Sequence, residues 1–134
     1  MIWVDNALVV APYFIGLCLD EKQFRKTQKA MGIPRKDWGE MVNPGSDATC
    51  HTFIKGDGSL AAIVTIGAHQ GKTIQQVHAL LVHEAVHIWQ NIRREIGEDS
   101  PSKEFEAYSI QSISQRLMEA YEELTAKSGK KAKK

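Results

Sequence analysis

The chain has few cysteines and no long apolar run, and each shortage excludes a class of protein. Only Cys18 and Cys50 are cysteines among its 134 residues. They stand far apart, without a Cys-x-x-Cys spacing, so neither a disulfide framework nor a cysteine zinc site is expected, and both thiols are interpreted as small buried side chains. No apolar run approaches the roughly 18 residues that a membrane-spanning helix needs. We therefore expect no contact with a membrane.

The sequence also lacks the marks of an exported or nucleic-acid-binding protein. Its first residues have no basic start and no cleavage signature, which favours a cytoplasmic location. The formal net charge is +1, and five of the 17 basic residues are lysines within residues 127–134, which leaves 12 basic against 16 acidic residues elsewhere. No basic patch is interleaved with aromatic residues, so a nucleic-acid partner is not expected. Residues 127–134 are predicted to be a flexible Lys-rich tail.

The remaining residues, 1–126, have the size and the composition of one soluble domain, with 43% hydrophobic and 25% charged residues in the whole chain. The turn-rich segment 56–59 predicts a hairpin between the two strands that flank it. The predicted elements are a buried strand at 8–19, a helix at 20–32, a loop at 33–47, strands at 49–55 and 60–66, a helix at 73–94, and a last helix from Ser100 to about Ala126. This order predicts an α+β fold in which a short mixed sheet packs on the last two helices.

The helix at 73–94 has a clear start and an unusual surface. Thr73 and Gln76 have the spacing of a capping box, in which each side chain bonds to the backbone N–H of the other residue. Apolar residues then occupy most of the circumference of the helix, which indicates burial on several sides. His83, Glu84 and His87 interrupt that apolar surface, and burial of ionisable groups is costly unless they find partners.

These three residues form a His-Glu-x-x-His motif. Histidines at i and i+4 lie one above the other on a helix, so both imidazoles of His83 and His87 can bind one metal ion. Glu84 lies about 100° further round the helix, where it can take a proton from a metal-bound water. The motif therefore predicts a zinc site with Glu84 as the general base of peptide hydrolysis.

A catalytic zinc ion usually has a third protein ligand, and several acidic residues follow the motif. The metzincin extension His-x-x-Gly-x-x-His is excluded, because Gln90 and Arg93 occupy the Gly and His positions. Helical periodicity places Glu106 nearer the apolar face of the last helix than Glu104. The nearby candidates are Glu95, Glu98, Asp99, Glu104 and Glu106, and the spacing alone leaves the choice open.

The segment Glu104-Phe105-Glu106-Ala107-Tyr108 resembles the Glu-x-x-Ala segment that carries the zinc-binding glutamate of gluzincin-type peptidases. CAAX prenyl proteases, small peptidases that act on phage-type repressors, and anthrax lethal factor share this form. The resemblance covers residues 83–108 and implies a zincin-like fold, a peptide or protein substrate, and Glu104 as the third ligand beside His83 and His87. Tyr108 departs from the usual polar residue, and either Tyr108 or Tyr121 could help to polarise a substrate carbonyl. The small size also resembles minimal zincin-like proteins of phage and prophage genomes.

Other functions remain open from the sequence. The chain could be a zinc-binding adaptor of zincin fold with little or no catalytic activity, or a metal-free interaction domain. In zincin-like enzymes a strand near the active helix often offers its open edge to an extended substrate, and strand 60–66 directly precedes the helix here. His51, His69 and His78 are expected to lie outside the metal site, although His51 could border the cleft.

Overall fold

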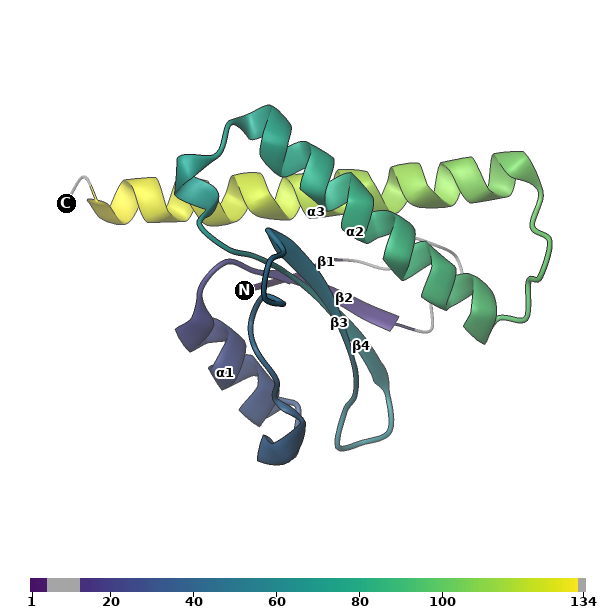
Figure 1. Cartoon of the computed structure of the whole chain (residues 1–134), viewed down its shortest axis with the longest axis horizontal. Helices are drawn as coiled ribbons and strands as arrows, with labels where there is room; N and C mark the ends of the chain where they lie inside the picture. Colours follow the sequence, from purple (N-terminus) through teal and green to yellow (C-terminus); the bar gives the residue numbers. More distant parts are fainter. Residues whose placement is uncertain (5–12, 133–134) are drawn as a thin grey trace.

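The computed structural model describes residues 1–4 and 13–132, with side chains through residue 126. A four-stranded mixed sheet lies between two layers of helices (Figure 1). The strands are β1 (Ile2–Val4), β2 (Tyr13–Cys18), β3 (Ala48–Ile54) and β4 (Leu60–Ile66), and the helices are α1 (Glu21–Ala30), α2 (Ile74–Glu95) and α3 (Lys103–Ala132). Two short 3₁₀ turns, η1 (Arg35–Asp37) and η2 (His69–Gly71), lie in the connections. The predicted α+β class is confirmed.

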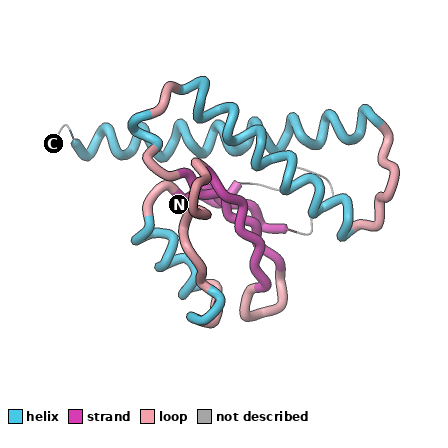
Figure 2. Tube along the Cα trace, viewed as in Figure 1, coloured by secondary structure: helices cyan, strands magenta, loops and turns pink. Residues whose placement is uncertain are grey.

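The sheet, magenta in Figure 2, has the strand order β1-β2-β4-β3, so β4 lies in the interior and β3 lies at an edge. β3 and β4 form the predicted antiparallel hairpin, in which Cys50 is opposite Val64. β2 runs parallel to β4, whereas β1 pairs antiparallel with β2. β1 was not predicted, and residues 8–12 of the predicted first strand lie outside the described residues.

The helix signals in the sequence are confirmed for α1 and α2. Asp20 caps α1 by accepting the backbone N–H of Gln23 at 2.8 Å. At the start of α2, the N–H of Gln76 donates to Oγ1 of Thr73 (3.1 Å) and the N–H of Thr73 donates to Oε1 of Gln76 (2.8 Å), which completes the capping box. Gly97 follows α2 with a φ of +74°, a left-handed conformation that glycine adopts at little cost.

The last helix differs from its prediction at both ends. It begins after Ser102, whose hydroxyl accepts the backbone N–H of Phe105 at 3.2 Å, rather than after Ser100. It continues to Ala132, so the backbone of residues 127–132 is helical where a flexible tail was expected. Among the described residues no helix is long and apolar enough to cross a membrane.

Each face of the sheet has its own hydrophobic core. α2 and α3 cover the face that carries Ile15 and Val64, and their buried side chains fill the larger core. α1 covers the other face, where Phe24 packs against Ile63 and Cys18. The alternation of the strands assigns each side chain to one core or the other. On the edge strand β3, Ala48, Cys50 and Thr52 therefore face α2, the helix that carries the histidine motif.

The loop before β3 is held by hydrogen bonds from the sheet. Nε2 of His51 lies 2.7 Å from the carbonyl oxygen of Met41, which also accepts the hydroxyl of Thr65. The backbone N–H of Asn43 donates to Oγ1 of Thr49 at 2.9 Å. His51 also packs against Phe24, with ring centroids 4.8 Å apart. His51 therefore lies on the α1 face of the sheet and does not border the face that α2 covers.

The environment of His51 predicts a loss of stability in mild acid. Burial lowers the pKa of His51 below its usual 6.5, so the unfolded chain binds a proton more readily than the folded chain. The stability that the neutral, buried His51 contributes to the folded chain is therefore fully present above pH 6.5. It is lost as the pH falls below that value, because the unfolded chain then gains a proton that the folded chain does not. Urea unfolding at pH 7.5 and pH 5.5 should show a smaller drop for His51→Gln than for the wild type. An equal drop in both proteins would contradict this assignment.

Candidate metal centre

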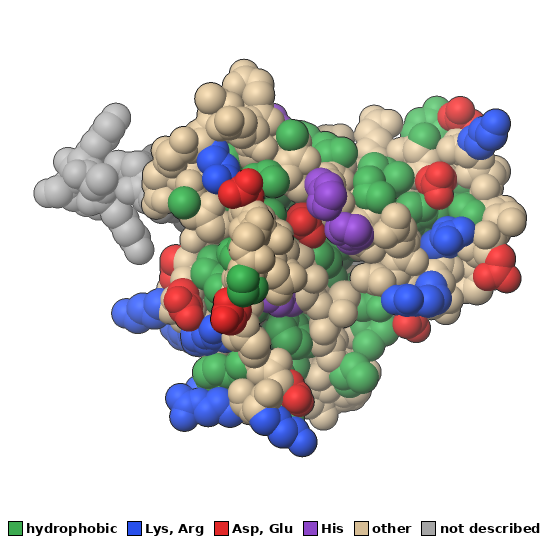
Figure 3. Space-filling model, viewed as in Figure 1, with side chains coloured by type: hydrophobic (Ala, Val, Ile, Leu, Met, Phe, Trp, Pro, Cys, Tyr) green, Lys and Arg blue, Asp and Glu red, His purple; other side chains and the backbone are tan. Residues whose placement is uncertain are grey.

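The two histidines of the motif come together on the exposed side of α2. Nε2 of His83 and Nε2 of His87 lie 3.2 Å apart, and the ring centroids are 4.9 Å apart. Figure 3 shows two adjacent histidine side chains at the surface over α2. Each Nε2 atom thus points toward the other, and one metal ion could accept a lone pair from both after a small separation of the rings. The i, i+4 geometry predicted from the sequence is present.

Glu84 is buried on α2 and lines a pocket together with both histidines and residues of β3. Only 5% of its surface is exposed. Burial raises the pKa of its carboxyl group, and the neighbouring His83 and His87 partly offset this effect. A carboxylate with a raised pKa accepts a proton more readily near neutral pH than an ordinary glutamate does. Glu84 is therefore a buried carboxyl group that lines the same pocket as the two histidines.

A pocket of about 370 Å³ opens between α2 and the edge strand β3. The loop before β3 closes one side of it. Its lining consists mainly of polar residues, which are Asn43, Ser46, Thr49, Cys50, Thr52, His83, Glu84, His87, Gln90 and Asn91, together with Ala48.

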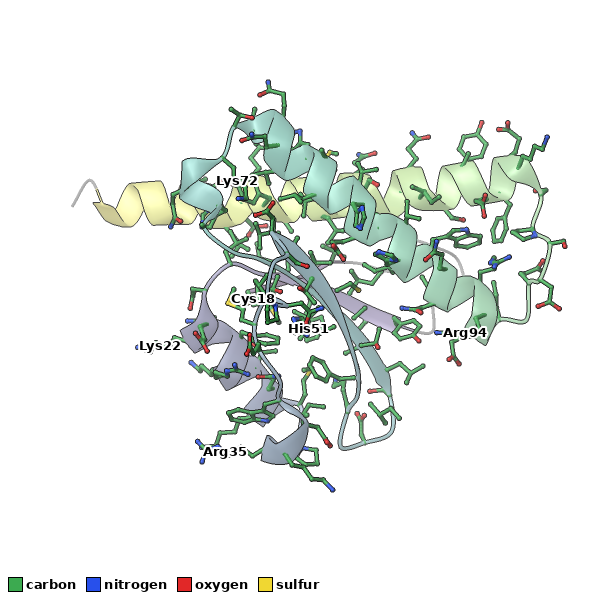
Figure 4. All side chains as sticks on the ribbon, in the orientation of Figure 1. Cys18, Lys22, Arg35, His51, Lys72 and Arg94 are labelled. Atoms are coloured by element: carbon green, nitrogen blue, oxygen red, sulfur yellow. The ribbon has the colours of Figure 1, made fainter. Side chains whose placement is uncertain are left out.

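A second pocket, of about 470 Å³, shares Ser46, Ala48, His83 and Glu84 with the first and continues toward the start of α2. The two pockets form one groove along α2, with the histidine motif where they meet. Figure 4 labels Lys72 just before α2 and Arg94 near its end, and the groove runs between these levels.

The strand that borders this groove is β3. The expectation that strand 60–66, which is β4, offers an open edge to an extended substrate is wrong. β4 pairs with β2 on one side and with β3 on the other, so its backbone has no open edge. β3 pairs only with β4 in the described part of the chain. The sequence located the hairpin correctly. Which of its two strands lies at the edge depends on β2, because β2 pairs with β4 and leaves β3 outermost.

The predicted third ligand does not join the histidine pair in this structure. Oε2 of Glu106 accepts the indole N–H of Trp89 at 2.9 Å, and Trp89 lies about 200° round α2 from His87. α3 therefore contacts the flank of α2 opposite the histidines. Glu104 lies about 200° round α3 from Glu106, is exposed, and lines neither pocket. Within residues 1–4 and 13–126, no three His, Cys, Asp or Glu side chains form a cluster that could hold a metal ion.

The two tyrosines that were considered as helpers also lie outside the groove. Tyr108 is 65% exposed on α3. The hydroxyl of Tyr121 lies 3.2 Å from Nδ1 of His69, between α3 and the turn before α2. Neither residue lines a pocket with the histidine motif. A role for either in polarising a substrate carbonyl has no support from their positions.

Sequence reasoning assigned only His83, Glu84 and His87 of the pocket's polar residues to the site, and missed Asn91 and Cys50 among others. Asn91 lies one turn after His87, and its Oδ1 accepts a hydrogen bond from Arg94 at 2.8 Å. Cys50 projects from β3 toward Glu84, and burial raises the pKa of its thiol to about 12, with a further contribution from the Glu84 charge. The i+4 spacing after His87 could have identified Asn91. Cys50 could be identified only once β3 was known to be the edge strand beside α2.

Two imidazole nitrogens beside a buried carboxylate suit Zn²⁺ well, since imidazole is a preferred zinc ligand and a catalytic site keeps a position open for water. The described residues supply two of the three protein ligands that such a site uses. Comparisons of the chain with protein-family models, with curated proteins and with solved structures find no match. A function for the chain must therefore be inferred from the residues of this groove.

Proposed function

We propose that the chain is a zinc metallopeptidase of gluzincin type with a zincin-like fold, acting on a peptide or protein substrate. One observation carries this proposal: the Nε2 atoms of His83 and His87 converge to 3.2 Å, and the buried Glu84 lines the same pocket as this pair. The same three side chains line a groove beside an open strand edge. A metal site, a proton acceptor and a surface for extended peptides therefore meet at one place.

Each residue of the motif has a distinct role in this proposal. His83 and His87 would hold the ion through Nε2. Zinc, when bound, would supply a Lewis acid that lowers the pKa of water toward neutrality and polarises a carbonyl group. Glu84 would accept a proton from the attacking water and deliver it to the departing amine.

The substrate would lie along β3 as an additional strand. An edge strand offers backbone N–H and C=O groups that can pair with an extended peptide. The groove continues on both sides of His83 and Glu84, so peptide residues on either side of the scissile bond would find a pocket. The polar lining around Thr52, Gln90 and Asn91 suits polar side chains at that end.

Glu104 remains the predicted third ligand, on the resemblance to gluzincins alone. It would reach the pair only if the first turns of α3 moved when the metal binds. On this proposal Glu104→Gln should weaken zinc binding at least about tenfold, whereas Glu106→Gln should leave it unchanged and lower the free energy of unfolding, because Trp89 loses a charged acceptor. Calorimetric zinc titration and urea unfolding measure the two effects. Wild-type zinc affinity in Glu104→Gln would remove Glu104 from the site.

A second candidate is a zinc-binding adaptor of zincin fold with little or no catalytic activity. The hydrogen bond between Glu106 and Trp89 favours it, because that bond holds α3 on the flank of α2 away from the histidines. Such a protein would bind zinc through His83 and His87 and bind a peptide along β3. It would not release cleavage products.

The two candidates are separated by metal content and peptide cleavage measured on the same preparation. The peptidase should carry one zinc ion per chain and cleave members of a mixed peptide library, as detected by mass spectrometry. Removal of zinc with a chelator should stop cleavage, and added zinc should restore it. Stoichiometric zinc without cleavage would favour the adaptor. A preparation that neither retains nor takes up zinc would refute both.

A further inference from the structure

We propose that Gln90 is a positioning residue that prepares His87, but not His83, for metal binding. This inference rests on the proposed metal site and concerns a residue to which the zincin resemblance gives no role. Oε1 of Gln90 lies 3.1 Å from Nδ1 of His87. Gln90 is three residues after His87 on α2, so the two side chains are neighbours on the helix surface. The contact also lies at the wall of the pocket, which Gln90 lines.

The contact determines where His87 carries its proton. An amide oxygen only accepts hydrogen bonds, so Nδ1 of His87 must donate to Oε1 of Gln90. In a neutral imidazole the other nitrogen then has a free lone pair. Nε2 of His87 therefore presents a lone pair toward Nε2 of His83, which is 3.2 Å away. This is the tautomer that a metal ion bound at Nε2 requires.

His83 is in the opposite state in the metal-free protein. Because Nε2 of His87 carries no proton, the short contact between the two rings is a hydrogen bond only if Nε2 of His83 donates. His83 must then transfer its proton from Nε2 to Nδ1 before it can bind the metal. The two histidines are therefore not equivalent: His87 is already prepared by Gln90, whereas His83 changes tautomer as the ion enters.

Nuclear magnetic resonance of the histidine ring nitrogens tests the tautomers directly. In the metal-free wild type, the proton should be on Nδ1 of His87 and on Nε2 of His83. Gln90→Met removes the acceptor while keeping the side-chain length, and should lose the Nδ1–H population of His87. Gln90→Glu keeps an acceptor oxygen and should restore it. A proton on Nε2 of His87 in the wild type would overturn the inference, whether or not the protein binds zinc.

Zinc titration of the same variants tests the consequence for metal binding. Loss of a group that orients a ligand typically costs about 10- to 100-fold in metal affinity. Gln90→Met should weaken zinc binding by that amount, Gln90→Glu should retain wild-type affinity or exceed it, and Gln75→Met, an exposed glutamine of α2 outside both pockets, should have no effect. Equal affinity of Gln90→Met and the wild type would refute a role for Gln90. Failure of the wild type itself to bind zinc would instead refute the proposed metal site, and the ring-nitrogen measurement would still decide whether Gln90 sets the tautomer.

Discussion

Glu84→Gln is expected to bind zinc with wild-type affinity and to lose at least about 100-fold of the peptide-cleaving activity, since a positioned general base contributes roughly 10²- to 10⁴-fold. Glutamine has nearly the same shape but cannot accept and return a proton. The two imidazole ligands are unchanged by the substitution, so the variant should keep its zinc while it loses its activity. Zinc analysis and cleavage of the peptide library, performed on one preparation, measure both. An active Glu84→Gln protein would overturn the assignment of Glu84 as general base.

The same variant should be more stable than the wild type when both are metal-free at pH 7. Glu84 is 5% exposed and burial raises the pKa of its carboxyl group, so keeping it ionised in the folded chain costs free energy. Glutamine removes that charge. Glu95→Gln is the control, because Glu95 is an exposed carboxylate on the same helix and lines neither pocket. A higher melting temperature for Glu84→Gln and no change for Glu95→Gln would indicate that the buried charge of Glu84 destabilises the folded protein. An unchanged or lower melting temperature for Glu84→Gln would contradict this.

Trp89→Ala is expected to cause a large loss of stability, about 3–5 kcal/mol, which is a typical cost of truncating a buried tryptophan. Trp89 is 1% exposed and lies in the core between the sheet and the two long helices. Its indole N–H also donates to Glu106, and its ring packs edge-on against Phe105 at 5.3 Å. Truncation would thus leave a cavity in the core and release the start of α3. Urea unfolding followed by circular dichroism measures the loss.

The matched control for this prediction is Trp3→Ala on β1. Trp3 is 41% exposed, so its truncation removes less buried apolar surface than the truncation of Trp89 does. Its cost should be less than half that of Trp89→Ala. Similar costs for the two substitutions would mean that Trp89 does not anchor α3 in the way that its contacts indicate.

The local elements of the fold could be predicted because their signals lie within a few residues of one another. The capping box of Thr73 and Gln76 and the left-handed Gly97 bound α2 closely. The segment between Lys55 and Ser59 makes a tight turn, closed by a backbone hydrogen bond of 2.7 Å between these residues, and this produced the hairpin. The convergence of His83 and His87 follows in the same way from helical spacing alone.

Features that depend on distant segments could not be predicted from such signals. The position of β3 at the edge is decided by the parallel insertion of β2, far back in the sequence. β1 has only three residues, too few to show an alternating pattern. The face of α3 that contacts α2 is decided by the packing of Trp89 with Phe105 and Glu106, and this contact directs Glu104 away from α2. The sequence alone therefore could not show whether Glu104 lies near the two histidines.

The parallel pairing of β2 with β4 also has a consequence for the order of folding. The β3–β4 hairpin closes a short turn and can form in about 1–10 μs, whereas Tyr13 must find Leu60 across 47 residues of chain. Such non-local pairing costs loop entropy before it gains stabilising contacts, and it slows folding. We expect this pairing to form in the rate-limiting step. The imidazole pair lies within one turn of α2, so on the proposed function the two histidines could bind zinc before the sheet is complete and before Glu84 is buried.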